Sequence, residues 1–142
     1  MQIQNLYDLA RQQNIEVLTY PMRENGSMSV MLENGKCFIG MDDDVRDGGV
    51  RERVHLSHEL GHCVTGSFYN RYAAVDSRRR HEDRADKWAI RKLLTVDQLD
   101  DAIAEGCTEL WQLAERFGVT EEFVKKAVCL YVHGNTATEL YF

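Results

Sequence analysis

The sequence predicts an α+β fold that is mostly helical with a small three-stranded antiparallel sheet. Apolar residues recur at helical spacing over most of the chain, and an Asn-Gly pair joins two runs of β-forming residues. The chain has 142 residues, of which 44% are hydrophobic and 28% are charged, and it contains 1 proline. This length and composition suit one compact domain with its own buried core.

The first part of the chain supplies the expected sheet. Residues 2–13 carry apolar side chains at positions i, i+3, i+4 and i+7, which predicts an amphipathic helix. Residues 15–20 form a short β-leaning run that stops at Pro21, so we expect a strand there. Two further β-leaning runs, 27–32 and 36–41, flank an Asn-Gly turn and predict a hairpin.

The rest of the chain is expected to be helical. Helices are predicted at residues 50–66, 78–94, 96–105, 109–117 and 121–132. Gly66 stands where a C-terminal cap would end the first of them, and the tail at 135–142 is expected to fray. We therefore expect one domain over residues 1–142, in which a helical segment at 96–142 packs on a core at 1–95.

Composition and charge exclude several classes of protein. The mean hydropathy is −0.44, and the sequence has no apolar stretch long enough to cross a bilayer. The N-terminus lacks the basic and apolar regions of a secretory signal, so we expect a cytoplasmic protein without a membrane partner. The formal net charge of −6 counts against nonspecific DNA binding, which depends on neutralising phosphates.

The cysteines are far apart in the sequence and form no Cys-x-x-Cys motif. They are Cys37, Cys63, Cys107 and Cys129. This spacing fits neither a zinc ribbon nor a redox pair, and a cytoplasmic chain keeps its thiols reduced. We expect reduced cysteines that serve as small buried apolar side chains.

An H-E-x-x-H pentapeptide lies inside the helix expected at 50–66. His58 and His62 are four residues apart, so their side chains lie on one face of the helix and both imidazoles can bind one ion. Catalytic zinc sites use three protein ligands and keep one position open for water. Glu59 is one residue away from this face, where it can act as general base toward the attacking water.

A third ligand is expected from the helix at 78–94. Glu82 and Asp86 share one face of that helix, where two like charges destabilise it unless a cation relieves them. We expect Glu82 to coordinate Zn²⁺ with His58 and His62, and Asp86 to accept the outer N–H of a ligating histidine. A His-His-Glu set also accepts other divalent metals, so the choice of zinc stays open at this point.

Two stretches resemble the ImmA/IrrE family of zinc metallopeptidases. Arg51-Glu-Arg-Val-His-Leu-Ser-His-Glu-Leu-Gly-His62 is similar to that family's basic and apolar lead-in to A-H-E-L-G-H. Glu82-x-x-Ala-Asp-x-Trp-Ala-x-x-x-Leu-Leu94 is similar to its E-x-x-A-N/D-x-F-A-x-x-L-L segment. The order of helix, strand, hairpin and two motif helices is also the family's, and the resemblance covers roughly residues 6–132.

The resemblance implies a zincin-like fold in which the H-E-x-x-H helix packs against a glutamate helix. It also implies a cytoplasmic zinc endopeptidase of the anti-repressor type, found in phages and mobile elements, whose protein substrate is a helix-turn-helix transcriptional repressor. The chain departs from the pattern at His55, Ser57 and Trp88, where threonine, alanine and phenylalanine are common. These departures spare the expected ligands and concern the wall of the substrate site.

Peptide hydrolysis also needs a hydrogen-bond donor for the developing oxyanion. The candidates in the sequence are His55, His81, Tyr69 and Tyr72. His55 lies one helical turn before the first motif histidine, and His81 precedes the expected glutamate ligand. The sequence does not choose among the four.

Two other functions stay open. The site could bind metal in an interaction module that is proteolytically silent. Residues 113–127 also resemble a helix-turn-helix with Gly118 at the turn, which would indicate a DNA-binding regulator with a structural metal. However, Glu121 and Glu122 open the helix that would have to meet bases and phosphates, so direct nucleic-acid binding is not expected.

Overall fold

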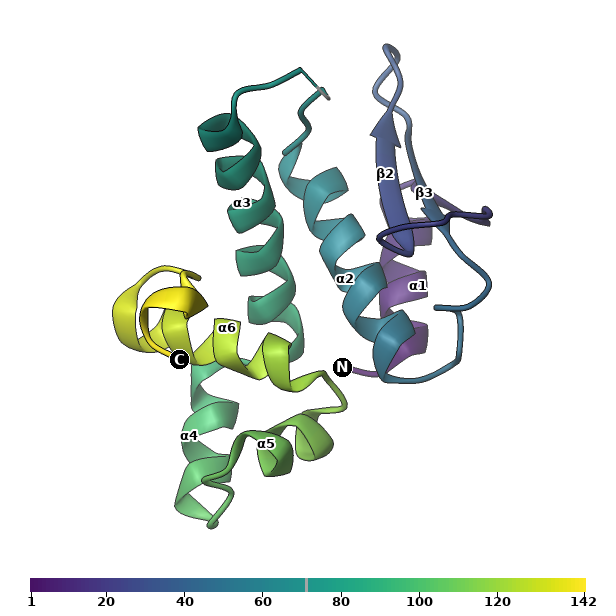
Figure 1. Cartoon of the computed structure of the whole chain (residues 1–142). Helices are drawn as coiled ribbons and strands as arrows, with labels where there is room; N and C mark the ends of the chain where they lie inside the picture. The colour runs from purple at the N-terminus through teal and green to yellow at the C-terminus, as the bar shows by residue number, and fades with distance from the viewer. Residues whose placement is uncertain (71) are drawn as a thin grey trace.

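Figure 1 shows a computed structural model of the chain, which describes residues 1–70 and 72–142. The elements in chain order are α1 (Ile3–Gln12), β1 (Glu16–Thr19), β2 (Ser27–Met31), β3 (Cys37–Met41), α2 (Val50–Thr65), α3 (Val75–Leu93), α4 (Val96–Ala104), α5 (Leu110–Phe117), α6 (Glu121–His133) and the 3-10 turn η1 (Thr138–Leu140). The predicted α+β class, mostly helical with a small sheet, is confirmed. The expected helices and strands are found within three residues of their predicted bounds.

The sheet is mixed, so the prediction of a wholly antiparallel sheet is wrong. Its strand order is β1-β3-β2, in which β2 and β3 form the expected antiparallel hairpin and β1 runs parallel to β3. Alternating side chains indicate which face of a strand is buried, and this pattern is the same for both pairing directions. The side chains of Cys37, Ile39 and Met41 are buried, as expected of a central strand, and β3 is the central strand. The direction of β1 depends instead on the route that the chain takes between the strands, which the pattern of buried residues does not reveal.

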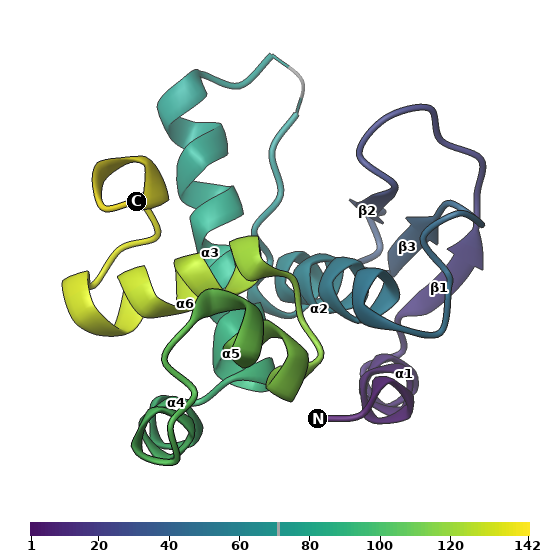
Figure 2. The ribbon, with the colours of Figure 1, turned by 60° about the horizontal axis from the view of Figure 1, so that its bottom comes forward.

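Helix α2 lies between the sheet and α3 (Figures 1 and 2). Its side chains Leu56 and Leu60 are fully buried, as are Ile39 of β3 and Ile90 of α3. Helix α1 packs against α2 and β1. The helix with the H-E-x-x-H motif is therefore held on two sides, which limits the positions that its side chains can take.

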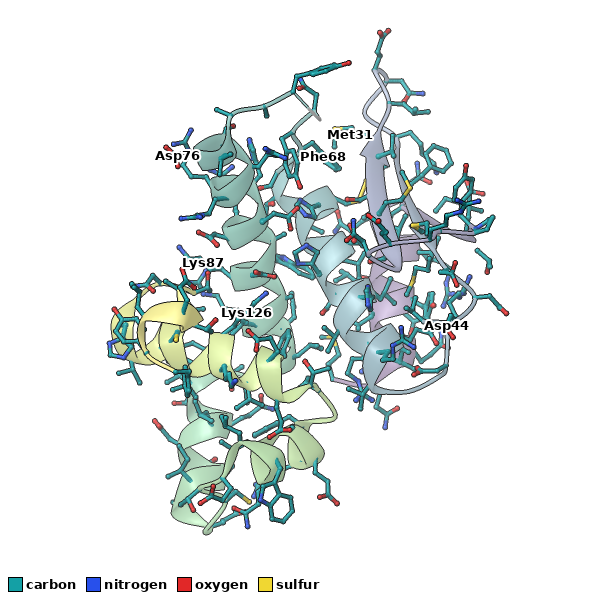
Figure 3. The ribbon with its side chains drawn as sticks, viewed as in Figure 1. Met31, Asp44, Phe68, Asp76, Lys87 and Lys126 are labelled. Carbon is teal, nitrogen blue, oxygen red and sulfur yellow. A yellow bond between two sulfur atoms is a disulfide. The ribbon has the colours of Figure 1, made fainter. Side chains whose placement is uncertain are left out.

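The C-terminal segment, residues 96–142, packs on this core through α6. The guanidinium of Arg53 on α2 donates to the carbonyl of Gly118 at 2.6 Å, and the hydroxyl of Tyr131 donates to the carbonyl of Leu94 at 2.7 Å. Gly118 has φ +64° and ends α5, as the turn prediction requires. Figure 3 shows Lys126 where α6 crosses α3. Buried apolar residues of both segments belong to one cluster.

The expectation of reduced thiols is wrong for two of the cysteines. Cys37 of β3 and Cys63 of α2 form a disulfide with a Cα–Cα distance of 6.1 Å, whereas Cys107 and Cys129 are free. Their separation of 26 residues gave no sign of pairing, because packing of the sheet on α2 brings them together. Among the described residues, no helix has the length and apolarity that a membrane crossing requires.

Candidate metal centre

The site depends on a close approach between α2 and α3. Gly61, inside the H-E-x-x-H motif, faces Ala85, which lies between Glu82 and Asp86 on α3. A Cβ atom on Gly61 would lie 2.5 Å from the carbonyl oxygen of Ala85, which is too close for any larger residue. A glycine in the middle of a helix lowers stability, so its presence at this position of the sequence indicates a special role. The close contact with Ala85 is that role.

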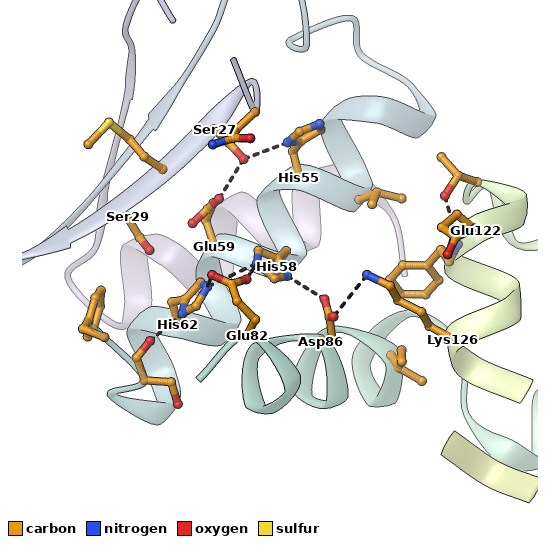
Figure 4. A pocket seen from close by; sticks show the side chains of 18 of the residues that line it. Ser27, Ser29, His55, His58, Glu59, His62, Glu82, Asp86, Glu122 and Lys126 are labelled. Carbon is orange, nitrogen blue, oxygen red and sulfur yellow. Dashed lines mark hydrogen bonds and ion pairs between the residues drawn. The ribbon is translucent and has the colours of Figure 1, made fainter. Parts of the chain in front are cut away.

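Three side chains meet where the two helices touch (Figure 4). The Nε2 atoms of His58 and His62 are 3.2 Å apart, and the Glu82 carboxylate lies 2.7 Å from His58 Nε2 and 3.2 Å from His62 Nε2. One donor atom from each residue lies within 4.8 Å of the other two. The structure thus brings together the three ligands predicted from separate segments of the sequence.

The outer nitrogens of both imidazoles are occupied. His58 Nδ1 lies 2.7 Å from the Asp86 carboxylate, and His62 Nδ1 lies 2.5 Å from the carbonyl oxygen of Ser67. Both partners accept hydrogen bonds, so each Nδ1 carries a proton and each Nε2 atom faces the other ligands. The Asp86 contact is the one expected from the sequence. The Ser67 contact was missed, because a backbone carbonyl leaves no residue-type signal.

This donor set fits a divalent metal ion. Two neutral imidazole nitrogens and one carboxylate oxygen are ligand types that zinc and other transition metals accept. In both histidines the hydrogen bond of the other nitrogen fixes the ring and the tautomer, as outer partners do in metal sites. Asp86 is itself held at 3.2 Å by Lys126 of α6.

Charge around the site favours bound protons when no metal is present. Burial lowers the pKa of His58, but hydrogen bonds to Asp86 and Glu82 outweigh burial and raise it to about 10. Burial raises the pKa of Glu82, whereas hydrogen bonds from the two imidazoles hold it well below its usual range. A metal that binds here must displace the proton that these groups share, so its affinity depends on pH.

Glu59 is buried beside the metal centre, with 6% of its surface exposed. Its carboxylate accepts a hydrogen bond of 2.7 Å from the hydroxyl of Ser27, at the start of β2. The same hydroxyl oxygen lies 2.7 Å from His55 Nδ1. Ser27 was missed in the sequence, because a lone serine in a strand has no distinguishing pattern.

The three ligands and Glu59 open into a cleft of about 930 Å³. One wall comes from β2 with Ser27, Met28 and Ser29, and the opposite wall comes from the start of α6. The residues in this wall are Thr120, which caps α6, and Glu122, Phe123 and Lys126 of the helix itself. The helix that the helix-turn-helix hypothesis would present to DNA therefore faces the cleft of its own chain.

The four candidate oxyanion donors lie in different surroundings. Tyr69 lines the cleft, and its hydroxyl donates to Glu82 at 2.8 Å. His55 lines the cleft too, but contacts Ser27. The ring of His81 stacks on Tyr69 at 6.1 Å between centroids, outside the set of described residues that line the cleft, and Tyr72 is 80% exposed. The structure thus brings the hydroxyl of Tyr69 to a predicted ligand, Glu82.

A His-His-Glu cluster on two packed helices of a small α+β fold defines a zincin-like class of metal centre. The chain belongs to the Peptidase_M78 family, described as the IrrE N-terminal-like domain, whose family model matches residues 10–128. The expected ImmA/IrrE resemblance is thereby confirmed, and membership supports a metal-dependent peptidase-type function. Comparisons with curated proteins and with solved structures gave no match.

Proposed function

We propose that the protein is a zinc-dependent endopeptidase that hydrolyses a peptide bond in a protein substrate. The observation that carries the proposal is the orientation of His58 and His62, whose Nδ1 atoms are bonded outward while both Nε2 atoms face Glu82. This is the arrangement that a metal with an open position needs. The peptidase family of the chain supports the same chemistry.

Glu59 is the general base of the proposed reaction. Bound at this site, zinc supplies Lewis-acid polarisation of the scissile carbonyl and lowers the pKa of the attacking water. Glu59 takes the proton from that water and passes it to the leaving amine. Its Oε2 atom accepts a hydrogen bond from Ser27, so we assign the proton transfer to Oε1.

Tyr69 is the proposed donor to the oxyanion. Its hydroxyl lies 2.8 Å from Glu82 and borders the cleft. Burial, together with the neighbouring Glu82 carboxylate, raises the pKa of Tyr69 to about 12. The phenol therefore keeps its proton at neutral pH and can donate it in a hydrogen bond to the developing negative charge.

An edge strand of the sheet offers a place for the substrate backbone. β2 stands at the edge of the strand order, and its residues Ser27, Met28 and Ser29 line the cleft. An extended peptide that pairs with this edge would run across the metal centre as an added strand. This supports cleavage within an unfolded or extended segment of a protein.

The substrate that we propose is a helix-turn-helix transcriptional repressor, so the protein would act as an anti-repressor. Support for this partner comes from membership of the IrrE-like family. The α6 wall of the cleft counts against the DNA-binding alternative, because part of the helix-turn-helix-like segment faces the candidate metal centre. A silent metal-binding module is the remaining alternative, which the experiment below distinguishes.

The test co-expresses the protein, in medium supplied with zinc, with a candidate helix-turn-helix repressor. Wild type is expected to hold one zinc per chain and to yield a truncated repressor. Glu59→Gln is expected to abolish the product and keep the zinc, because it removes only the base. Glu115→Gln, at an exposed position of α5, is the matched control and is expected to cleave like wild type.

Two results would contradict the proposal. If zinc-loaded wild type leaves the repressor intact, the protein is a silent module toward it. If Glu59→Gln cleaves as fast as wild type, Glu59 is not the base. Zinc stoichiometry measured on the same samples shows whether a loss of cleavage comes from a loss of metal.

A further inference from the structure

Ser27 joins two side chains of α2 that lie one helical turn apart. Its hydroxyl donates to Glu59 Oε2 at 2.7 Å, and its oxygen lies 2.7 Å from His55 Nδ1 (Figure 4). Ser27 is 9% exposed and Glu59 is 6% exposed, so the contact is shielded from bulk water. Hydrogen bonds to a charged group in such surroundings are stronger than those between neutral groups.

The direction of these hydrogen bonds follows from the groups involved. The hydroxyl of Ser27 has one proton, and the Glu59 carboxylate can only accept it. The serine oxygen therefore accepts from Nδ1–H of His55, which sets the tautomer of that histidine. The chain of donation runs from His55 to Ser27 to Glu59, and His55 reaches the base only through the hydroxyl.

The backbone around Ser27 holds the hydroxyl in place. Ser27 pairs with Met41 in the β2–β3 ladder, and the carbonyl of Gly26 accepts from the amide of Asp42 at 2.9 Å. Gly26 has φ +78°, and a Cβ atom there would lie 2.8 Å from Val45 Cγ1. A Cβ atom there would also lie 3.1 Å from Cε1 of His55, so the residue before β2 is packed against both the loop before α2 and α2 itself, where only glycine fits.

We propose that Ser27 is a positioning residue for the general base Glu59, and that His55 holds Ser27 in its turn. A glutamate side chain turns about three bonds, and fixing Oε2 leaves Oε1 as the oxygen that meets the attacking water. The proposal rests on the proposed peptidase function. It replaces the expectation that His55 stabilises the oxyanion directly, because His55 is engaged with Ser27.

The first test compares Ser27→Ala with Ser57→Ala by steady-state kinetics on the repressor. Ser57 is also a buried serine, on α2, and its hydroxyl donates to the carbonyl of Val54 in its own helix. Contrary to the expectation that it borders the substrate site, it is not among the described residues that line the cleft. We expect Ser27→Ala to lower kcat about tenfold with KM and zinc content unchanged, whereas Ser57→Ala stays within twofold of wild type. A kcat within twofold of wild type for Ser27→Ala would overturn the proposal.

The second test asks whether Ser27 acts through Glu59. In Glu59→Asp the shorter side chain cannot reach the serine hydroxyl, so adding Ser27→Ala should change kcat by less than twofold. If Ser27→Ala costs the same tenfold in this background, its effect comes from the fold and not from the base.

His55→Phe is expected to lower kcat about threefold in wild type and to have no effect beside Ser27→Ala. An unchanged kcat in the single variant removes His55 from the proposal.

A third measurement separates the proposal from the peptidase function itself. In the metal-free protein, Ser27→Ala should lower the thermal midpoint of wild type by more than it lowers that of Glu59→Ala, because in the second background only the contact with His55 remains to be lost. This coupling requires no turnover. Coupling without any cleavage by zinc-loaded wild type refutes the peptidase function and the positioning role with it. Cleavage without coupling refutes the positioning role alone.

Discussion

The two halves of the molecule contribute to the cleft in different ways. The core, residues 1–95, holds the three candidate ligands and Glu59 on α2 and α3, whose backbones touch at Gly61. The segment at 96–142 adds no candidate ligand to that cluster, but its helix α6 supplies a wall of the cleft and the Lys126 contact to Asp86. The candidate ligands thus all come from the core, whereas the C-terminal segment forms part of the wall of the cleft.

Gly61→Ala tests the contribution of the core and has the largest expected effect, a loss of zinc affinity. The new methyl group forces α3 away from α2 and carries Glu82 with it, so zinc affinity should fall by at least about a hundredfold. Competition with a chromophoric chelator measures the loss. Gly49→Ala, at the start of the same helix, is the control, since its Cβ meets only ordinary contacts. Equal zinc affinity in the two variants would contradict the role given to the close approach.

The metal-free core should also respond to pH. The pKa of His58 is raised to about 10 in the folded chain, above its value near 6.5 in the unfolded chain. Its stabilising effect is therefore complete below about pH 6.5 and is lost as the pH rises through 10. Urea unfolding between pH 7 and 10 should show a fall of up to about 1 kcal/mol per pH unit. Zinc-loaded protein should not show this fall, because the metal has displaced the proton. A metal-free stability that rises over this range would contradict the charge network described for His58.

Lys126→Met tests the contribution of the C-terminal segment and has the smallest expected effect on stability and zinc affinity. The variant removes a partly buried ion pair with Asp86, which should lower the free energy of unfolding by about 1 kcal/mol. Zinc affinity should stay within about threefold of wild type, since Asp86 keeps its bond to His58. Lys125→Met, next to it and paired loosely with Glu122 at 3.9 Å, is the control. A loss of zinc as large as that of Gly61→Ala would show that the C-terminal segment also determines metal affinity.

The site was predictable in outline because helical periodicity converts spacing into direction. His58 and His62, four residues apart, had to share a face, and so did Glu82 and Asp86. Their mutual distances, and those between the rings and their outer partners, depend on how two helices pack. The residue type of Gly61 hints at that packing, but only the contact with Ala85 explains why it must be glycine.

Other features had no local signal. The parallel pairing of β1 with β3 and the Cys37–Cys63 disulfide both depend on the path of the chain between distant elements. Ser27 and Ser67 are ordinary residues by type, and each gains its importance from a neighbour more than four positions away. Their contacts could not be inferred from spacing within one element.

The sequence by itself determined the elements of this protein, the two motif helices and the chemistry of the side chains that they carry. It did so because secondary structure and side-chain direction follow from short-range periodicity. The tertiary structure decided which nitrogen of each histidine faces inward, which residue holds Glu59, and which helix closes the cleft. These depend on contacts between segments far apart in the chain, and their geometry arises only when the core packs.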